Sequence, residues 1–225
     1  MVEVAPTPNY RANLAHVLGV YLVTDEASCA GRRLTDVVMA AVQGGASCVQ
    51  LREKNLSTRN FCAKAIALQA LLAPLGVALV INDRVDIALA CGAPGVHLGQ
   101  SDMPVAIARR LLPPAVFLGL SVETLAQVAQ AATAAMAGVD YLGVSPVFAT
   151  PTKTDTSAPW GLAGLRQVRM ATTLPLVAIG GIHAGNAADV LAAGADGLAV
   201  VSAICRAKDP ALAAHELRTI WEKKA

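Results

Sequence analysis

The repeating unit of this chain is clearest over residues 33–51, RLTDVVMAAVQGGASCVQL. Residues 33–43 carry apolar side chains at helical spacing, and the small-residue turn Gly44-Gly45-Ala46 follows them, as is usual where a helix ends. Residues 47–51 are a short apolar run with the length of a buried strand. A helix, a glycine turn and a strand in this order indicate an α/β protein with a parallel sheet.

The same unit recurs to the end of the chain. We expect strands at 18–23, 47–51, 78–81, 95–98, 117–120, 141–144, 176–179 and 197–200. We expect helices near 33–43, 58–73, 84–91, 104–111, 123–136, 161–170, 186–193 and 210–223. Eight such units, with no Gly-x-Gly-x-x-Gly motif after the first strand, favour a closed (β/α)₈ TIM barrel over an open doubly wound sheet.

Length and composition support one domain with a large core. The chain has 225 residues, of which 55% are hydrophobic and 15% charged, and single α/β barrels commonly reach this length. We expect the catalytic barrel to occupy residues 18–225. Residues 1–17 are expected to form an N-terminal arm or lid over the lower end of the barrel, to which we assign no function.

Several classes of protein are excluded by the distribution of charge, cysteine and apolar residues. No apolar run approaches the roughly 20 residues that cross a bilayer, and an export signal is not apparent, so we expect a cytoplasmic protein. The net charge is only +2, and the sequence has no run of basic residues of the kind that binds nucleic acid. The oligomeric state is open, and a homo-oligomer is compatible with the sequence. Reduced thiols are expected for the five scattered cysteines, Cys29, Cys48, Cys62, Cys91 and Cys205.

Polar residues follow the second expected strand in residues 48–54, CVQLREK. The alternation of side chains along a strand sends Gln50, Arg52 and Lys54 to one side, toward the mouth of the barrel. A barrel strand is buried on both faces, so Arg52 needs an anionic partner, and an anionic ligand at the C-terminal rim supplies one. The alternative is an ordinary solvated strand end.

Two carboxylates are expected at the same rim. Asn82 and Asp83 follow the third strand, and Asp102 follows the fourth. Carboxylates beside Arg and Lys suit Mg²⁺ bridging a diphosphate, because magnesium takes few protein carboxylates and completes its shell with water and phosphate oxygens. The alternative is helix capping, since Asp83 opens a helix and Asp102 precedes Pro104 at an expected helix start. The pairing of the carboxylates beside cations favours the metal.

The last three strands carry the features of a phosphate site. A long polar loop with hydroxyls and a lysine follows the sixth strand over residues 145–154, and such loops are usually binding segments or lids. The seventh strand ends in Gly180-Gly181, and Ser202 follows the eighth. In TIM barrels these two rims commonly bind phosphate through backbone N–H groups. A tight turn at the glycines is the alternative.

Two polar residues on the middle strands are harder to interpret. Ser121 closes the fifth strand, where a serine that caps the next helix would be unremarkable. His97 lies within an apolar strand and is expected to be a hydrogen-bonded core histidine rather than a base. The sequence shows no evident Ser-His-Asp, Cys-His or His-metal set.

Taken in order, these motifs resemble those of the thiamine phosphate synthase family. The resemblance covers nearly the whole chain after residue 18 and rests on QLREK at 50–54, ND at 82–83, GVHLGQSD at 95–102, TPTK at 150–153, GGI at 180–182 and VS at 201–202. It implies a transferase that joins 4-amino-2-methyl-5-pyrimidinylmethyl diphosphate to thiazole ethyl phosphate carboxylate. The implied products are thiamine phosphate, pyrophosphate and CO₂.

The resemblance also implies a role for each residue of the motifs. The residues implied to bind the pyrimidine diphosphate are Gln50, Arg52, Lys54, Asn82, Ser121 and Lys153, and those implied to bind the thiazole phosphate are Thr150, Thr152, Gly181, Val201 and Ser202. Asp83 and Asp102 are the implied ligands of Mg²⁺. The implied catalytic residues are Ser121, Lys153 and Arg52. The implied reaction releases the diphosphate first and leaves a pyrimidine cation that the thiazole captures. Such a step needs charge neutralisation and exclusion of water more than a strong base.

Some positions depart from the family pattern, and two other functions compete. Ser145 stands where a glycine is common, and Ala149 where a proline often precedes the Thr-x-Thr-Lys segment, which affects the loop geometry. A thiazole tautomerase would share the barrel and the thiazole phosphate site, and a regulatory barrel would bind a thiamine-related phosphate without turnover. A tautomerase characteristically lacks the diphosphate and metal set, which this chain retains as Arg52, Lys54, Asp83 and Asp102.

Overall fold

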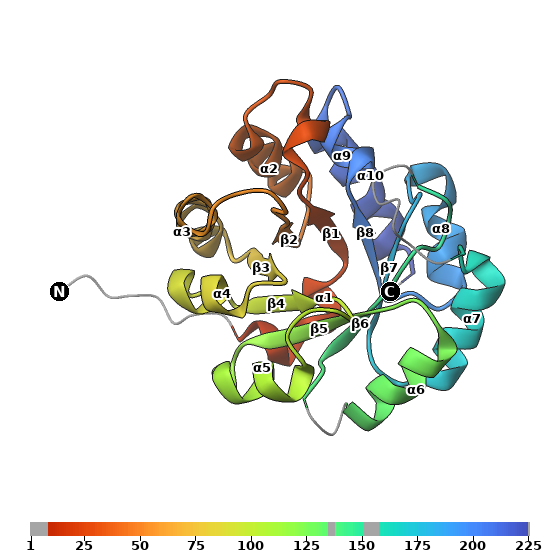
Figure 1. Cartoon of the computed structure of the whole chain (residues 1–225). Helices are drawn as coiled ribbons and strands as arrows, with labels where there is room; N and C mark the ends of the chain where they lie inside the picture. The colour runs from red at the N-terminus through yellow and green to blue at the C-terminus, as the bar shows by residue number, and fades with distance from the viewer. Residues whose placement is uncertain (1–8, 135–137, 151–157, 225) are drawn as a thin grey trace.

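The chain forms a closed barrel of parallel strands surrounded by helices (Figure 1). The computed structural model describes residues 9–134, 138–150 and 158–224. Each strand pairs with the next one in the sequence, and the last closes onto the first. The strands are β1 Val20–Val23, β2 Cys48–Leu51, β3 Ala78–Asn82, β4 Gly95–Leu98, β5 Phe117–Val122, β6 Tyr141–Val144, β7 Leu176–Ile179 and β8 Gly197–Val200. The predicted (β/α)₈ barrel is confirmed, and the open-sheet alternative is wrong.

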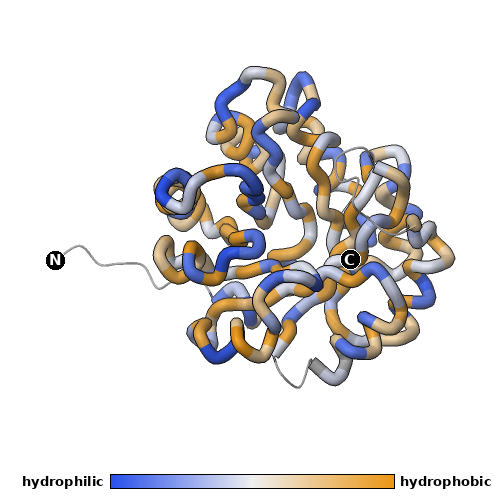
Figure 2. The backbone as a smooth tube through the Cα atoms, viewed as in Figure 1, coloured by the Kyte–Doolittle hydropathy of each residue, from blue (hydrophilic) through white to orange (hydrophobic). Residues whose placement is uncertain are grey.

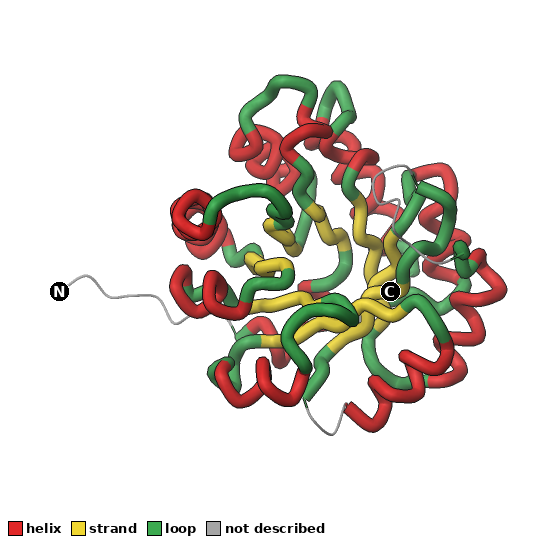
Figure 3. The backbone as a smooth tube through the Cα atoms, in the orientation of Figure 1, coloured by secondary structure: helices red, strands yellow, loops and turns green. Residues whose placement is uncertain are grey.

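Helices cover the outside of the barrel, as Figure 3 shows. The α-helices are α1 Leu14–Val17, α2 Leu34–Gln43, α3 Thr58–Leu72, α4 Val85–Cys91, α5 Val105–Leu111, α6 Leu125–Ala134, α7 Gly161–Ala171, α8 Ala184–Ala192, α9 Ser202–Cys205 and α10 Pro210–Glu222. Short 3₁₀ segments are η1 Tyr10–Asn13, η2 Glu26–Cys29 and η3 Ala73–Leu75. The short helix α9 was not expected from the sequence.

The boundaries of β1 and β5 differ from the expected ones for reasons of local hydrogen bonding. The first strand begins at Val20 rather than at residue 18, because the Leu18 N–H donates to the Leu14 carbonyl and so belongs to the end of α1. The fifth strand runs on to Val122, because that residue pairs with Val144 of β6. Helix α6 therefore starts later than expected.

The core has two layers on either side of the strands. Residues such as Leu22 and Val49 point outward and pack against the helices. Tyr21 and Val23, one position away from Leu22, point into the barrel together with Phe117. Figure 2 shows hydrophobic residues along the strands and hydrophilic ones on the loops near the ends of β2 and β3. Within the described residues no helix is long and apolar enough to span a membrane.

Glycines on β5 and β6 leave space for rings inside the barrel. A Cβ atom at Gly119 would lie 2.5 Å from the Tyr141 hydroxyl oxygen and closer still to carbons of the ring. One at Gly143 would lie 2.9 Å from Cε1 of His97. These contacts are too short for any side chain, so glycine at both positions leaves the space that the Tyr141 and His97 rings occupy.

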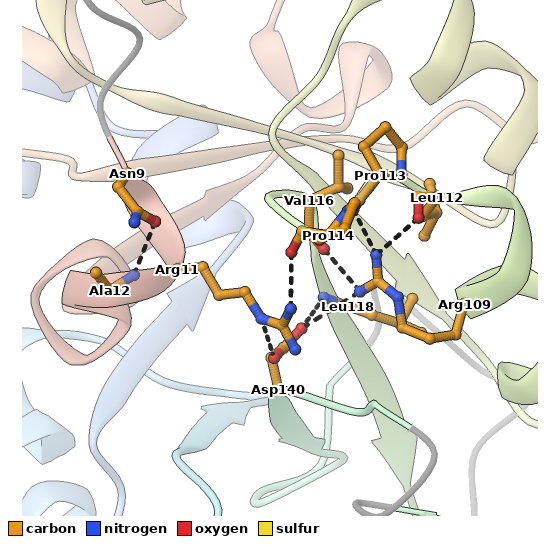
Figure 4. Close-up of polar contacts among 10 residues, drawn as sticks. All are labelled: Asn9, Arg11, Ala12, Arg109, Leu112, Pro113, Pro114, Val116, Leu118 and Asp140. Atoms are coloured by element: carbon orange, nitrogen blue, oxygen red, sulfur yellow. Dashed lines mark hydrogen bonds and ion pairs between the residues drawn. The ribbon is translucent and has the colours of Figure 1, made fainter.

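The segment before β1 packs against the N-terminal ends of the strands. Tyr10 and Leu14 are buried in the inner core. The Arg11 side chain donates to the Pro114 carbonyl and, through Nε, to Oδ1 of Asp140 at 2.7 Å, while the other oxygen of Asp140 accepts the Leu118 N–H at 2.8 Å (Figure 4). An ion pair and apolar contacts thus hold this segment to the barrel. Residues 1–8 of the expected arm lie outside the described residues.

Candidate active site

A cavity of about 810 Å³ opens where the strands end. This is a volume typical of sites for small organic ligands. The cavity is lined by every expected site residue that the structure describes, namely Gln50, Arg52, Lys54, Asn82, Asp83, Asp102, Ser121, Thr150, Gly181, Val201 and Ser202. The expected residues Thr152 and Lys153 lie outside the described residues. The barrel thus brings together residues that are far apart in the sequence.

Cationic side chains line the wall formed by the end of β2. Arg52 and Lys54 line the cavity, whereas Glu53 between them turns to α3 and pairs with Lys64 at 2.6 Å. The predicted alternation is therefore confirmed. Within the described chain the Arg52 guanidinium forms no ion pair, and the Lys54 amine lies 2.5 Å from Oδ2 of Asp83. This wall can accept an anion with little rearrangement of Arg52.

Neither of the two carboxylates expected at the metal site caps a helix. Helix α4 has Arg84 at its N-cap, and Asp83 before it has a φ of 65°, which is left-handed and uncommon for any residue except glycine. Helix α5 has Pro104 at its N-cap, while Oδ2 of Asp102 accepts the N–H of Gly99 at 2.6 Å. The capping alternative is therefore wrong for both residues. The strained backbone directs the Asp83 carboxylate into the cavity.

The two carboxylates lie close enough to interact electrostatically. Burial raises the pKa of the Asp102 carboxyl above its ordinary value, and the neighbouring Asp83 carboxyl raises this pKa further. A cation between them would relieve this repulsion. In the described part of the chain no group of three metal-ligating side chains forms. A pair of carboxylates does fit Mg²⁺, which completes its shell with water and phosphate oxygens.

Backbone turns form the opposite wall of the cavity. Gly180 and Gly181 have φ values of 108° and 63°, so the tight turn considered from the sequence is present, and it lines the cavity. A Cβ at Gly181 would lie 2.8 Å from Cβ of Phe148 and 3.0 Å from the Ala149 carbonyl oxygen. Glycine here allows the loop after β6 to approach the end of β7. Val201 and Ser202 complete this wall at the start of α9.

The floor of the cavity is a set of hydrogen-bonded side chains. His97 lies 2.9 Å from the Tyr141 hydroxyl through Nδ1 and 2.8 Å from the Ser121 hydroxyl through Nε2. The prediction of a hydrogen-bonded core histidine is confirmed. Ser121 lies inside β5, so its interpretation as a helix cap is wrong. The Tyr141 and Tyr21 hydroxyls are 3.0 Å apart, and Nε2 of Gln50 donates to Tyr21 at 2.8 Å.

Comparison with known proteins identifies the family. The family model for thiamine monophosphate synthase matches residues 20–204. The chain belongs to the thiamine monophosphate synthase family. Among its curated relatives, the thiamine-phosphate synthase of Albidiferax ferrireducens is 68% identical, covering 93% of this chain and 96% of the relative. That of Chloroflexus aurantiacus is 50% identical, with coverage of 92% and 95%.

Solved structures agree with membership of the thiamine monophosphate synthase family. Thiamine phosphate pyrophosphorylase from Pyrococcus furiosus matches with a TM-score of 0.84 and 38% identity, covering 94% of this chain and 99% of that one. A 3-hexulose-6-phosphate synthase matches with a TM-score of 0.64 at 19% identity, covering 90% and 99%. The second likeness shows a shared fold alone.

The sequence analysis did not predict that two tyrosines lie in the floor of the cavity. Tyr21 and Tyr141 lie in apolar strands, where each reads as an ordinary core aromatic. A buried phenol needs a hydrogen-bond partner, and the strand period places both hydroxyls inside the barrel with His97. The need of a buried phenol for a partner, together with the strand period, could have predicted this cluster of Tyr21, Tyr141 and His97.

Proposed function

We propose that this chain joins 4-amino-2-methyl-5-pyrimidinylmethyl diphosphate to thiazole ethyl phosphate carboxylate, giving thiamine phosphate, pyrophosphate and CO₂. The observation that carries the proposal is that three features line the same cavity: the cations Arg52 and Lys54, the carboxylates Asp83 and Asp102, and the turn at Gly180-Gly181. Relatives named thiamine-phosphate synthase that are aligned over more than nine tenths of the chain support the same reaction.

The cationic wall would hold the pyrimidine diphosphate. Arg52 offers a planar fork of donors that can bind two phosphate oxygens at once, and Lys54 adds a second positive charge. Asn82 is buried and lines the same wall. Gln50 and Ser121 lie deeper, where the pyrimidine ring would sit, and Lys153 is assigned to the diphosphate by the family motif alone.

Asp83 and Asp102 would hold Mg²⁺ at the diphosphate. When bound, the ion would neutralise charge that develops on the leaving pyrophosphate. Lys54, which contacts Asp83 in the structure, would then be available to the phosphate oxygens. The 2.6 Å hydrogen bond from Gly99 keeps the Asp102 carboxylate directed at the site.

The opposite wall would hold the thiazole phosphate. Gly181, Val201 and Ser202 present backbone N–H groups at the ends of β7 and β8, and Thr150 faces them from the loop after β6. Thr152 joins this set by the family motif. The thiazole nitrogen would then be held facing the pyrimidine methylene, so that the C–O bond breaks, pyrophosphate leaves with the bonding pair and a C–N bond forms. The alkylated thiazole would then lose its carboxylate as CO₂, and a proton from solvent would take its place on the ring carbon.

The reaction places modest demands on proton transfer, which agrees with the residues present. Breaking the C–O bond requires stabilisation of the leaving pyrophosphate, and cations supply it. Holding both substrates in one cavity supplies proximity and excludes water from the pyrimidine cation. Arg52, Lys153 and Ser121 are therefore proposed to act by binding charge and orienting the ring.

Release of pyrophosphate from the two purified substrates, with and without Mg²⁺, tests the proposed function. A synthase releases pyrophosphate in a magnesium-dependent way and forms thiamine phosphate. A tautomerase converts the thiazole carboxylate without using the diphosphate, and a regulatory barrel binds the phosphates without turnover. Either of these two results would overturn the proposal.

Asp102→Asn tests the metal assignment. Asn keeps an oxygen that can accept the Gly99 N–H but removes the negative charge, so we expect the melting temperature to persist while the magnesium concentration for half-maximal rate rises about tenfold or more. Asp36→Asn is the matched control, because Asp36 is an exposed partner of Arg33 on α2. An unchanged magnesium dependence in Asp102→Asn would remove this residue from the metal site.

A further inference from the structure

The floor of the cavity is one continuous hydrogen-bonded chain across the barrel. It runs from Gln50 on β2 through Tyr21 on β1 and Tyr141 on β6 to His97 on β4 and Ser121 on β5. Each link is between 2.8 and 3.0 Å long. Both ends of the chain, Gln50 and Ser121, line the cavity, so the chain connects two ligand-facing groups on opposite sides of the floor.

The distances leave the donor open at the links through Tyr141 and His97, and the donation from Gln50 to Tyr21 favours one order of protons along them. Nε2 of Gln50 donates to the Tyr21 hydroxyl, so the Tyr21 proton is free to be donated to Tyr141. If Tyr21 donates to Tyr141, the Tyr141 proton goes to Nδ1 of His97, and a neutral imidazole then carries its own proton on Nε2 and donates it to Ser121. In this order the Ser121 hydroxyl proton points to the cavity, and the side-chain oxygen Oε1 of Gln50 remains as an acceptor.

The opposite order between the tyrosines would leave the Tyr21 proton with a poorer partner. The Cys48 thiol also faces Tyr21, but a thiol sulfur accepts hydrogen bonds more weakly than a phenol oxygen. Burial raises the pKa of both Tyr21 and Tyr141 well above its ordinary value, and burial likewise raises the pKa of Cys48. These groups therefore keep their protons, as the ordered chain requires.

Packing holds the members of the chain in place. Tyr141 is fully buried, with its ring centre 6.3 Å from that of Tyr21 and 5.5 Å from that of His97. The glycines at 119 and 143 admit the Tyr141 and His97 rings but leave no space for movement toward the strands. Packing therefore keeps these groups in hydrogen-bonding distance, and the weakness of the Cys48 acceptor favours the order that starts from Gln50.

We propose that Tyr21, Tyr141 and His97 are positioning residues that present an acceptor at Gln50 and a donor at Ser121, and thereby select an aminopyrimidine over its 4-oxo counterpart. This inference rests on the proposed function of the same cavity. An aminopyrimidine carries an amino donor and ring-nitrogen acceptors, which complement this order. The 4-oxo ring carries a carbonyl acceptor and a ring N–H donor, which oppose it.

Binding selectivity tests the proposal. Calorimetry in the presence of Mg²⁺ would compare 4-amino-2-methyl-5-pyrimidinylmethyl diphosphate with its 4-oxo counterpart. We expect the parent protein to prefer the amino compound and Tyr141→Phe or Tyr21→Phe to reduce that preference about tenfold, the value of roughly one hydrogen bond. Tyr10→Phe is the matched control, because Tyr10 is a buried tyrosine that does not belong to this series of hydrogen bonds. If Tyr141→Phe and Tyr21→Phe both fold and both prefer the amino compound as strongly as the parent protein does, the proposal is overturned.

The tautomer of His97 is a second readout that needs no substrate. Nitrogen-15 NMR of the protein, with the four histidines distinguished by a His97→Gln variant, should show the proton of His97 on Nε2. In Tyr141→Phe this preference should be lost. A proton on Nδ1 in the parent would overturn the proposed order. Failure of the parent to bind either diphosphate would overturn the proposed function instead, while the tautomer still decides the order of the chain.

Discussion

Gly119→Ala is expected to destabilise the protein by overpacking the floor of the cavity. Alanine in an unstrained strand position would otherwise stabilise a protein by about 0.4–1 kcal/mol, because it restricts the unfolded chain. Here the new Cβ would overlap the ring of Tyr141 and lie 2.5 Å from its hydroxyl oxygen. The ring packs against Tyr21, His97 and Phe117, so it can yield only toward the cavity. The sign of the measured change therefore tests the packing argument.

Overpacking of a well-packed core costs about 1–3 kcal/mol, and we expect a value within this range because the ring can relax only toward the cavity. For a protein of this size each kcal/mol lowers the melting temperature by roughly 2–4 °C. Thermal and urea unfolding followed by circular dichroism would measure it. Tyr141→Leu removes the ring, so Gly119→Ala should cost at least about 1 kcal/mol less in that background. Additive effects, or a Gly119→Ala protein as stable as the parent, would refute the reasoning.

Three further predictions concern the two walls of the cavity and the lower end of the barrel. Arg52→Lys keeps the charge but loses the fork, so pyrophosphate release should slow about tenfold or more with an unchanged melting temperature; parent kinetics would contradict a two-point contact. Gly181→Val must displace the loop at Phe148, so calorimetry should show weaker thiazole phosphate binding and nearly unchanged pyrimidine diphosphate binding. Asp140→Asn removes the carboxylate that pairs with Arg11, which keeps only its bond to the Pro114 carbonyl, so urea unfolding should show a loss of about 2 kcal/mol with activity retained below the transition.

The sequence by itself determined the barrel and the composition of its rim. Strand and helix periods repeat eight times, and a parallel strand directs alternate residues to opposite sides, so Arg52 and Lys54 could be placed on one face without coordinates. The ends of parallel strands meet at one rim, which brought Asp83 and Asp102 into the same expected site. The specific motifs then carried the family resemblance.

The capping alternatives could be settled only by the tertiary structure. Whether Asp83 and Asp102 cap helices depends on backbone dihedral angles and on which N–H group each oxygen meets. Asp83 takes a left-handed φ of 65°, and Asp102 accepts from Gly99 rather than from its helix. Local sequence preferences favour capping at such positions and cannot register a conformation that the surrounding barrel imposes.

The hydrogen-bonded floor was likewise decided by tertiary structure. Its members come from five strands, and Gln50 and Ser121 are 71 positions apart in the sequence. Apolar strands predict a buried tyrosine or histidine but not its partner, because the partner depends on strand tilt, register and the space that Gly119 and Gly143 leave open. Period and composition describe one strand at a time, whereas the polarity of this floor arises only when the barrel closes and the strands face one another.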